Sequence, residues 1–262
     1  MSKPPYRWTS STVTHVGNVR KVNEDSCLDR GDVGLWVVAD GMGGHASGDL
    51  ASQLIVNTLA KIEPAKKLAE YVDRIEEALL KVNQRLIDMA AQTNQTSGST
   101  VVVLLAFGRH GIIVWAGDSR IYRLRGGEIR QLTTDHSQVE MYVEQGLISR
   151  EEAALHPAGN MVTRAVGAAA DLFLELDIHE LQHGDRYLLC SDGLDKHVAD
   201  PEIAKILGKG DPKTAAQSLI DVTLARGAVD NVTVSVVEIL GAGRNTKTNG
   251  VEDDTRPATV NE

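Results

Sequence analysis

The stretch Leu35-Trp36-Val37-Val38-Ala39-Asp40-Gly41 runs from a short apolar segment directly into a carboxylate and a glycine. A second apolar segment, residues 187–190, reaches Asp192-Gly193 almost as directly. Brief apolar runs of this kind are typical of buried strands. A glycine after the carboxylate lets the backbone turn tightly and brings its carbonyl close to a ligand. We therefore expect Asp40 and Asp192 at strand ends beside a common ligand.

Further apolar segments predict a domain rich in strands. Two glycine-containing turns, Ala116-Gly117-Asp118-Ser119 and Arg125-Gly126-Gly127-Glu128, are interpreted as hairpins, which favours antiparallel pairing. The predicted strands are residues 35–39, 101–107, 112–116, 121–124, 129–132, 172–178, 187–190 and 232–239.

A stripe of apolar residues with alternating spacings of four and three indicates one face of a long helix. It consists of Leu68, Val72, Ile75, Leu79, Val82, Leu86 and Met89. Packing against a sheet explains this face, and a partner-binding coiled coil is the alternative. Asp200-Pro201 and Asp211-Pro212 each combine an N-cap carboxylate with a proline suited to the first helical position, so two short helices are expected there.

Helices inserted in blocks among antiparallel strands indicate an α+β fold. No repeat and no Pro/Ser-rich linker interrupts the predicted elements, so we expect one domain over residues 8–240. Residues 241–262 contain almost no large apolar side chain, which predicts a disordered C-terminal tail.

The composition argues against several classes of protein. Of the 262 residues, 42% are apolar, and 36 Asp and Glu exceed 27 Lys and Arg to give a formal charge of −9. This balance disfavours nucleic acids and membrane surfaces as partners. The longest apolar run, Val101–Phe107, is too short to span a membrane, and the first residues lack a secretory signal pattern. We expect a cytoplasmic protein in which Cys27 and Cys190 are reduced.

Six acidic residues lie beside predicted strands or turns, and these are Glu24, Asp25, Asp40, Asp118, Asp192 and Asp230. In an antiparallel sheet some strand starts and strand ends share one edge, so the six carboxylates can meet there. Clustered carboxylates repel one another unless a cation compensates, and oxygen ligands without a Cys/His cluster select Mg²⁺ or Mn²⁺. Two such ions would activate water and neutralise a phosphoryl group, which predicts hydrolysis of a phosphate ester. The alternative for each aspartate is a turn cap.

Eight segments in chain order resemble the metal-dependent Ser/Thr protein phosphatases of type 2C, the PPM family, in the bacterial stand-alone form. They cover nearly the whole predicted domain, and each is weakly specific alone. The segments are residues 20–25 (RKVNED), 40–45 (DGMGGH), 97–101 (SGSTV), 117–120 (GDSR), 132–137 (LTTDHS), 163–167 (TRAVG), 191–194 (SDGL) and 230–233 (DNVT).

The resemblance implies a four-layer α/β/β/α sandwich, two antiparallel sheets flanked by helices, with two Mn²⁺ or Mg²⁺ ions at one end. The implied ligands are Asp25, Asp40, the Gly41 carbonyl, Asp192 and Asp230, with Asp40 as the bridge between the ions. Glu24 is expected as a ligand or as a neighbour of the ligands, and Asp118 is expected to hold a third ion together with Asp192.

The resemblance further implies that Arg20 binds the phosphoryl group, since a guanidinium offers two parallel donors to its oxygens. His45 is a candidate general acid, and a structural role at a helix N-terminus is the alternative. The implied substrates are phosphoserine and phosphothreonine in proteins, produced by a cognate Ser/Thr kinase. We expect the protein to act as a monomer.

Four other functions fit the sequence less well. Residues 41–46 fit the glycine pattern of a dinucleotide site, but no second parallel strand follows in the predicted elements. A cysteine-based phosphatase needs an arginine six residues after its cysteine, whereas Val33 and Lys196 stand there, and no P-loop pattern is present. A non-catalytic phosphoprotein-binding module on the same fold is disfavoured by the complete set of aspartates.

Overall fold

The computed structural model describes residues 6–43, 48–153, 156–159 and 161–241 of the chain. Its strands are β1 (Tyr6–His15), β2 (Asp25–Arg30), β3 (Leu35–Gly43), β4 (Ser97–Ser99), β5 (Val101–Phe107), β6 (His110–Ala116), β7 (Arg120–Arg125), β8 (Glu128–Gln131), β9 (Glu175–Glu180), β10 (Arg186–Cys190) and β11 (Val232–Gly241). Its helices are α1 (Gly48–Leu59), α2 (Leu68–Thr93), α3 (Gln138–Glu144), α4 (Arg150–Ala153), α5 (Asp192–Asp195), α6 (Asp200–Leu207) and α7 (Pro212–Ala225).

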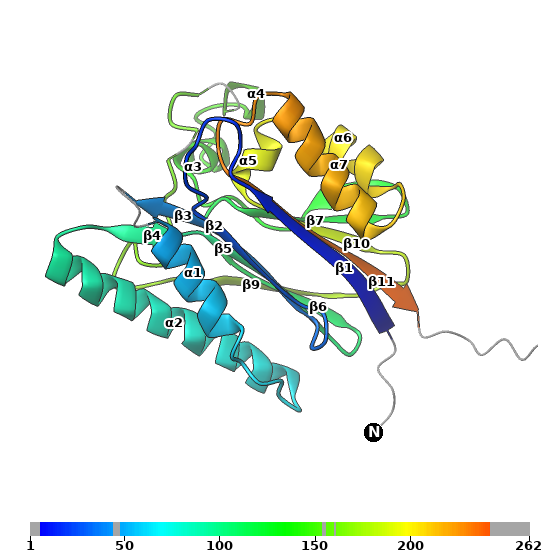
Figure 1. The fold of residues 1–262 in the computed structure, drawn as a ribbon, viewed down its shortest axis with the longest axis horizontal. Helices are drawn as coiled ribbons and strands as arrows, with labels where there is room; N and C mark the ends of the chain where they lie inside the picture. Colours follow the sequence, from blue (N-terminus) through cyan, green and yellow to red (C-terminus); the bar gives the residue numbers. More distant parts are fainter. Residues whose placement is uncertain (1–5, 44–47, 154–155, 160, 242–262) are drawn as a thin grey trace, which may run out of the picture.

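Two antiparallel sheets pack face to face, with helices on both outer sides (Figure 1). One sheet has the strand order β1-β11-β10-β7-β8, and the other has the order β2-β3-β5-β6-β9 with β4 beside β3. Helices α1 and α2 cover the outer face of the β3 sheet, and α6 and α7 cover the outer face of the β10 sheet. The predicted α+β fold and its four-layer α/β/β/α arrangement are confirmed.

Strand β3 is apolar on both faces because it lies between two layers. Leu35, Val37 and Ala39 pack toward the helices, while Trp36 and Val38 pack toward the opposite sheet. All five side chains are fully buried. This double burial explains why the strand reads as a continuous apolar run rather than an alternating one. It also makes the strand a rigid support for the carboxylate at its end.

The apolar stripe of α2 is buried within the protein's own core. Val72, Ile75, Leu79, Val82 and Leu86 pack in the same cluster as Ile55 and Leu59 of α1 and the outward-facing residues of β3. The long helix predicted from the spacing is confirmed. Its stripe is occupied by the sheet and α1, so the alternative of a partner-binding coiled coil is wrong.

The chain crosses between the sheets at residues 117–119, where a hairpin was predicted. Strand β6 pairs with both β5 and β9, so neither of its edges is free for β7. Strand β7 instead pairs with β8 and β10 in the other sheet. The predicted hairpin at Ala116-Gly117-Asp118-Ser119 is therefore wrong, and the one at Arg125-Gly126-Gly127-Glu128, between β7 and β8, is confirmed.

Three strand features differ from the sequence-based expectations. Strand β1, rich in Ser and Thr, was not predicted, yet it pairs with β11 from Tyr6 opposite Gly241 to His15 opposite Val232. Strand β2 was not predicted either, and it begins at Asp25, which pairs with Asp40 of β3. The strand predicted at residues 172–178 is displaced to Glu175–Glu180, since Leu172 and Leu174 pack on the core before it begins.

The two Asp-Pro pairs behave differently. Asp211 caps α7, and its side chain accepts a hydrogen bond from the Thr214 amide. Asp200 does not cap α6, because Ala199 occupies the N-cap and Asp200 is the first helical residue. Strand β3 is antiparallel to both β2 and β5, so the parallel β-α-β unit that a dinucleotide site requires is not formed there.

None of the helices in the described part of the chain combines the length and apolar character that crossing a bilayer requires. The first described strand, β1, begins at Tyr6, and the last, β11, ends at Gly241, so both ends are within two residues of the predicted domain limits of 8 and 240. Those limits stay a prediction, and the predicted tail at 241–262 lies, apart from Gly241, outside the described residues.

We predict that Leu79→Ala lowers the free energy of unfolding by about 2–5 kcal/mol, because it leaves a cavity under α2. The neighbouring Leu80 is 47% exposed, so Leu80→Ala is a matched control that we expect to cost less than about 1 kcal/mol. Urea unfolding of both variants measures the difference. Equal losses would contradict the assignment of the buried face.

Candidate metal centre

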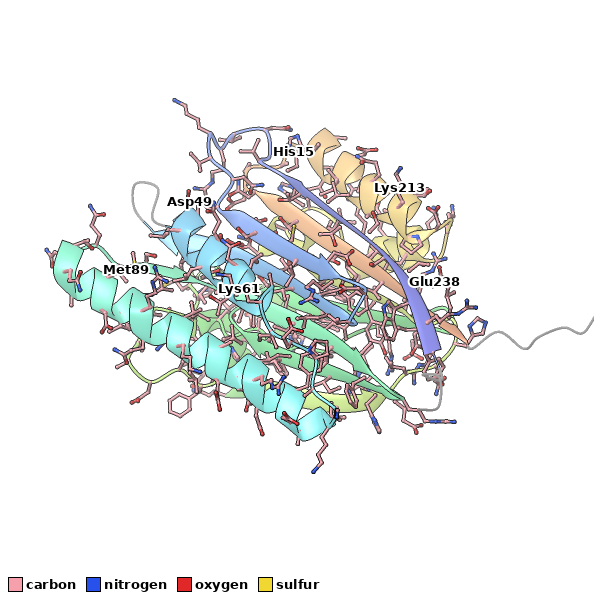
Figure 2. All side chains as sticks on the ribbon, turned by 60° about the horizontal axis from the view of Figure 1, so that its bottom comes forward. His15, Asp49, Lys61, Met89, Lys213 and Glu238 are labelled. Carbon is pink, nitrogen blue, oxygen red and sulfur yellow. The ribbon has the colours of Figure 1, made fainter. Side chains whose placement is uncertain are left out.

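A cavity of about 360 Å³ opens at one end of the sandwich. The strands extend between this end and the opposite end near Glu238, and His15 and Asp49 lie on the cavity side (Figure 2). The cavity is lined by most of the predicted site residues, namely Arg20, Glu24, Asp40, Gly41, Asp118, Asp192 and Asp230. Asp25 is the cross-strand partner of Asp40. The structure thus brings together every predicted site residue except His45, which lies outside the described residues.

Asp25 is buried, and only one of its carboxylate oxygens is satisfied. Oδ2 accepts hydrogen bonds from Ser191 Oγ and Thr233 Oγ1, each at 2.7 Å. Oδ1 is buried without a hydrogen-bond partner. Burial raises the pKa of Asp25 to about 7, and the nearby charges of Asp192 and Asp230 act in the same direction. An orphaned carboxylate oxygen inside a protein is costly unless something positive meets it.

Asp40 and Gly41 are held through their backbone. The amide of Thr100 donates to the Asp40 carbonyl at 2.9 Å, and the Asp40 amide donates to Thr100 Oγ1 at 3.2 Å. A Cβ at Gly41 would lie 2.1 Å from the Gly48 carbonyl oxygen, so only glycine fits. Burial, together with the charges of Asp25 and Asp192, raises the pKa of Asp40 well above its usual range.

Asp118 lies on the segment that crosses between the sheets. Gly117 precedes it with φ +116°, and a Cβ there would lie 2.5 Å from the Thr100 side chain. The glycine thus permits both the left-handed backbone and the close approach to Thr100. Burial raises the pKa of Asp118 to about 7, and the charge of Asp192 contributes to this shift.

Asp192 and Asp230 are paired with cations of the protein. Asp192 begins α5 and forms an ion pair with Lys196 one helical turn later. Asp230 pairs with Arg20 at 2.9 Å, and the Arg20 side chain is half exposed. Across the described residues, no three Asp, Glu, His or Cys side chains already have the arrangement of a metal site. The carboxylates lie around one cavity, and two of them, Asp192 and Asp230, form ion pairs with Lys196 and Arg20.

Sequence reasoning missed two residues that organise this end of the sandwich. The Asn231 side chain accepts from the Glu24 amide at 2.8 Å and donates to the carbonyls of Val16 and Val22, which ties the β1–β2 loop to the start of β11. Lys196 lines the cavity and neutralises Asp192. Asn231 stands directly after Asp230 in a recognised segment, whereas nothing in the sequence pattern singled out Lys196.

The donor set fits divalent cations that prefer oxygen. The acidic side chains offer hard oxygen ligands, and the unpartnered Oδ1 of Asp25 is available as one of them. The raised pKa values of Asp25, Asp40 and Asp118 reflect burial and mutual repulsion, both of which a bound cation would offset. The residues present are therefore suited to Mg²⁺ or Mn²⁺.

A family model for protein phosphatase 2C matches residues 16–231. The chain belongs to the protein phosphatase 2C family. The match spans β2 to α7 and all the acidic residues of the cavity, so the family resemblance inferred from eight short segments is confirmed.

Solved structures of related phosphatases share this fold. PppA, described as a key regulatory component of T6SS in Pseudomonas aeruginosa, is 44% identical with a TM-score of 0.84, and the match covers 89% of this chain and 98% of PppA. The catalytic domain of the serine/threonine protein phosphatase PstP, in complex with 2 manganese ions, is 34% identical with a TM-score of 0.81. That match covers 90% of this chain and 99% of the PstP domain.

The whole PstP protein is longer than this chain. The serine/threonine protein phosphatase PstP of Mycobacterium tuberculosis is 37% identical over 229 residues, which cover 86% of this chain but 43% of PstP. The present chain therefore spans less than half the length of that protein phosphatase 2C relative.

We predict that the metal-free protein loses stability as pH rises from about 5.5 to 7.5. Asp25 and Asp118 have a pKa of about 7 in the fold, against about 4 in an unfolded chain. The folded state therefore retains protons that the unfolded chain has released, and folding becomes less favourable as the pH approaches the folded-state pKa.

Asp25→Asn tests this prediction, because an amide keeps an acceptor for Ser191 and Thr233 but does not titrate. With chelator at pH 7.5 we expect its Tm to exceed that of the wild type by several degrees, given roughly 2–4 °C per kcal/mol in a domain of this size. At pH 5.5 the difference should shrink. Thermal unfolding across this range measures both values, and a variant less stable at pH 7.5 would refute the repulsion argument.

Proposed function

We propose that the protein is a metal-dependent phosphatase that hydrolyses phosphoserine and phosphothreonine in proteins. The observation that carries this proposal is the cavity that Arg20 lines together with a group of mutually repelling carboxylates. Such a group attracts divalent cations, and cations beside an arginine attract a phosphate ester. Membership of the protein phosphatase 2C family supports the same reaction.

We propose that two Mn²⁺ or Mg²⁺ ions bind Asp25, Asp40, the Gly41 carbonyl, Asp192 and Asp230, with Asp40 shared between them. Asp118 and Asp192 would hold a third ion, and Glu24 would lie beside the first two. Divalent cations in such a site lower the pKa of water and neutralise the charge of a phosphoryl group. The two manganese ions in the PstP catalytic domain support this arrangement by analogy.

Arg20 has the freedom that a phosphate-binding residue needs. Its ion pair with Asp230 is exposed, and exposed pairs contribute at most about 1 kcal/mol. When cations take over Asp230, the guanidinium is free to turn to the phosphoryl oxygens with two parallel hydrogen bonds. Lys196 stands in the same relation to Asp192. In the metal-free protein, Arg20 and Lys196 thus pair with carboxylates that the metal ions would later bind.

Proteins phosphorylated by a cognate Ser/Thr kinase are the expected substrates, and the protein is expected to act as a monomer in the cytoplasm. His45 remains the candidate general acid.

We predict that the protein hydrolyses p-nitrophenyl phosphate and a phosphothreonine peptide with Mn²⁺ and that a chelator abolishes turnover. Asp40→Ala should reduce kcat at least about a hundredfold, because the loss of several kcal/mol of charge stabilisation corresponds to that factor. Asp73→Ala, on the exposed face of α2, is the matched control and should leave kcat unchanged. Binding of the phosphopeptide without turnover would instead indicate a phosphoprotein-binding module.

We predict that Arg20→Lys raises KM about tenfold or more and changes kcat less. Lysine keeps the charge but loses the paired donors, and a hydrogen bond to a charged group is worth about 1.5–3 kcal/mol. Steady-state kinetics with the phosphothreonine peptide separates the two constants. An unchanged KM would show that Arg20 does not contact the phosphoryl group.

A further inference from the structure

His136 is buried beside the segment that carries Asp118, outside the metal cavity itself. Its ring stacks on Trp115 with centroids 6.2 Å apart and planes at 11°. The Trp115 indole donates to the Thr134 carbonyl at 2.9 Å, which ties β6 to the segment directly before His136. Both ring nitrogens of His136 have partners, and these partners lie on different segments.

His136 clasps Gly117 with two hydrogen bonds. The Gly117 amide donates to His136 Nδ1 at 3.0 Å, and the His136 amide donates to the Gly117 carbonyl at 2.9 Å. Gly117 has a left-handed backbone with φ +116°, and Asp118 follows it immediately. In the described part of the chain, no side chain donates a hydrogen bond to the Asp118 carboxylate. The backbone at Gly117 therefore sets where that carboxylate points.

The partners of His136 define its tautomer. Since Nδ1 accepts from Gly117, the proton resides on Nε2, which donates to Glu175 Oε1 at 3.0 Å. Arg164 Nη1 donates to the same oxygen at 3.0 Å. Glu175 reaches this position because it begins β9 directly opposite Trp115. Burial lowers the pKa of His136, which favours the neutral ring that this arrangement requires.

We propose that His136 is a positioning residue for the third cation. His136 holds Gly117 so that Asp118 faces Asp192. Glu175 accepts the hydrogen bond from Nε2 and so favours the tautomer whose Nδ1 is unprotonated. The inference rests on the proposed function, which assigns the third ion to Asp118. Hydrogen-bond partners of metal ligands commonly change metal affinity about 10–100-fold when they are removed. His136 acts one step further away, through the backbone next to the ligand.

Mn²⁺ titration of the metal-free protein tests this role without any turnover. Calorimetry, with free Mn²⁺ followed by electron paramagnetic resonance, counts the ions and measures each affinity. We expect wild-type protein to bind two ions tightly and a third weakly, and Asp118→Asn to lose the third. His136→Ala should weaken the third ion about tenfold or more and leave the first two unchanged.

Two further variants separate positioning from general stability. His136→Asn places an amide oxygen near the position of Nδ1, so it should restore most of the affinity for the third ion. His179→Ala is the matched control, because His179, a partly buried histidine on β9, likewise has a hydrogen-bonded imidazole, with Nε2 2.8 Å from the Tyr187 hydroxyl. It should leave the affinity for all three ions unchanged, whatever it does to the Tm.

Several results would overturn the inference. These are a wild type that binds only two ions, a His136→Ala protein with wild-type affinity for the third ion, and a His136→Asn protein as weak as His136→Ala. If His136→Ala does not fold, His136→Phe decides, because a phenyl ring keeps the stacking on Trp115 but cannot accept the hydrogen bond from the Gly117 amide. A weaker third ion then supports the role of His136, and an unchanged one refutes it.

Failure of the proposed function gives a different result. A wild type that binds three ions, with the third weakened by His136→Ala, but hydrolyses no phosphopeptide would refute the phosphatase proposal and leave the positioning role intact. Metal-dependent turnover, together with a third ion whose affinity does not change in His136→Ala, would support the phosphatase proposal and refute the positioning role.

Discussion

Repulsion among buried carboxylates is the constraint on which this end of the molecule depends. Asp25, Asp40 and Asp118 are held where burial and neighbouring negative charges oppose their ionisation. A cluster of this kind persists only if the surrounding structure cannot relax away from it. The sandwich meets this requirement, because β3 is buried on both faces and its end cannot move without disturbing two apolar clusters.

The acidic residues come from both sheets, and hydrogen bonds connect the two sheets beside them. Ser191 and Thr233, from the β10 sheet, donate to the Asp25 carboxylate of the β3 sheet. Thr100 contacts both Asp40 and the segment that carries Asp118, through the hydroxyl of Ser119. Small hydroxyl side chains thus connect the two sheets where aliphatic packing ends. They position carboxylates without adding charge, and the exposed Arg20 supplies positive charge at the cavity mouth.

Sequence patterns predicted what depends on local periodicity, and they failed where distant pairing decides. The double burial of residues 35–39 and the stripe of α2 leave clear signals, and both elements were predicted correctly. The turn at Gly117 looks locally like a hairpin, yet β9 takes the edge of β6 that β7 would need. The Ser- and Thr-rich β1 has no apolar alternation to reveal it. The role of Asn231 depends on carbonyls more than 200 residues away, which no local pattern encodes.

The pairing of β1 with β11 has a consequence for how the protein is made. These strands are the first and the last in the described chain, and they lie side by side along their full length. Asp230 and Asn231 stand directly before β11, so the cavity lacks one wall until that strand has left the ribosome. The helical layer of α1 and α2 can begin to pack much earlier, since its contacts are closer in sequence. The cavity therefore cannot be complete until β11 has been synthesised and has paired with β1.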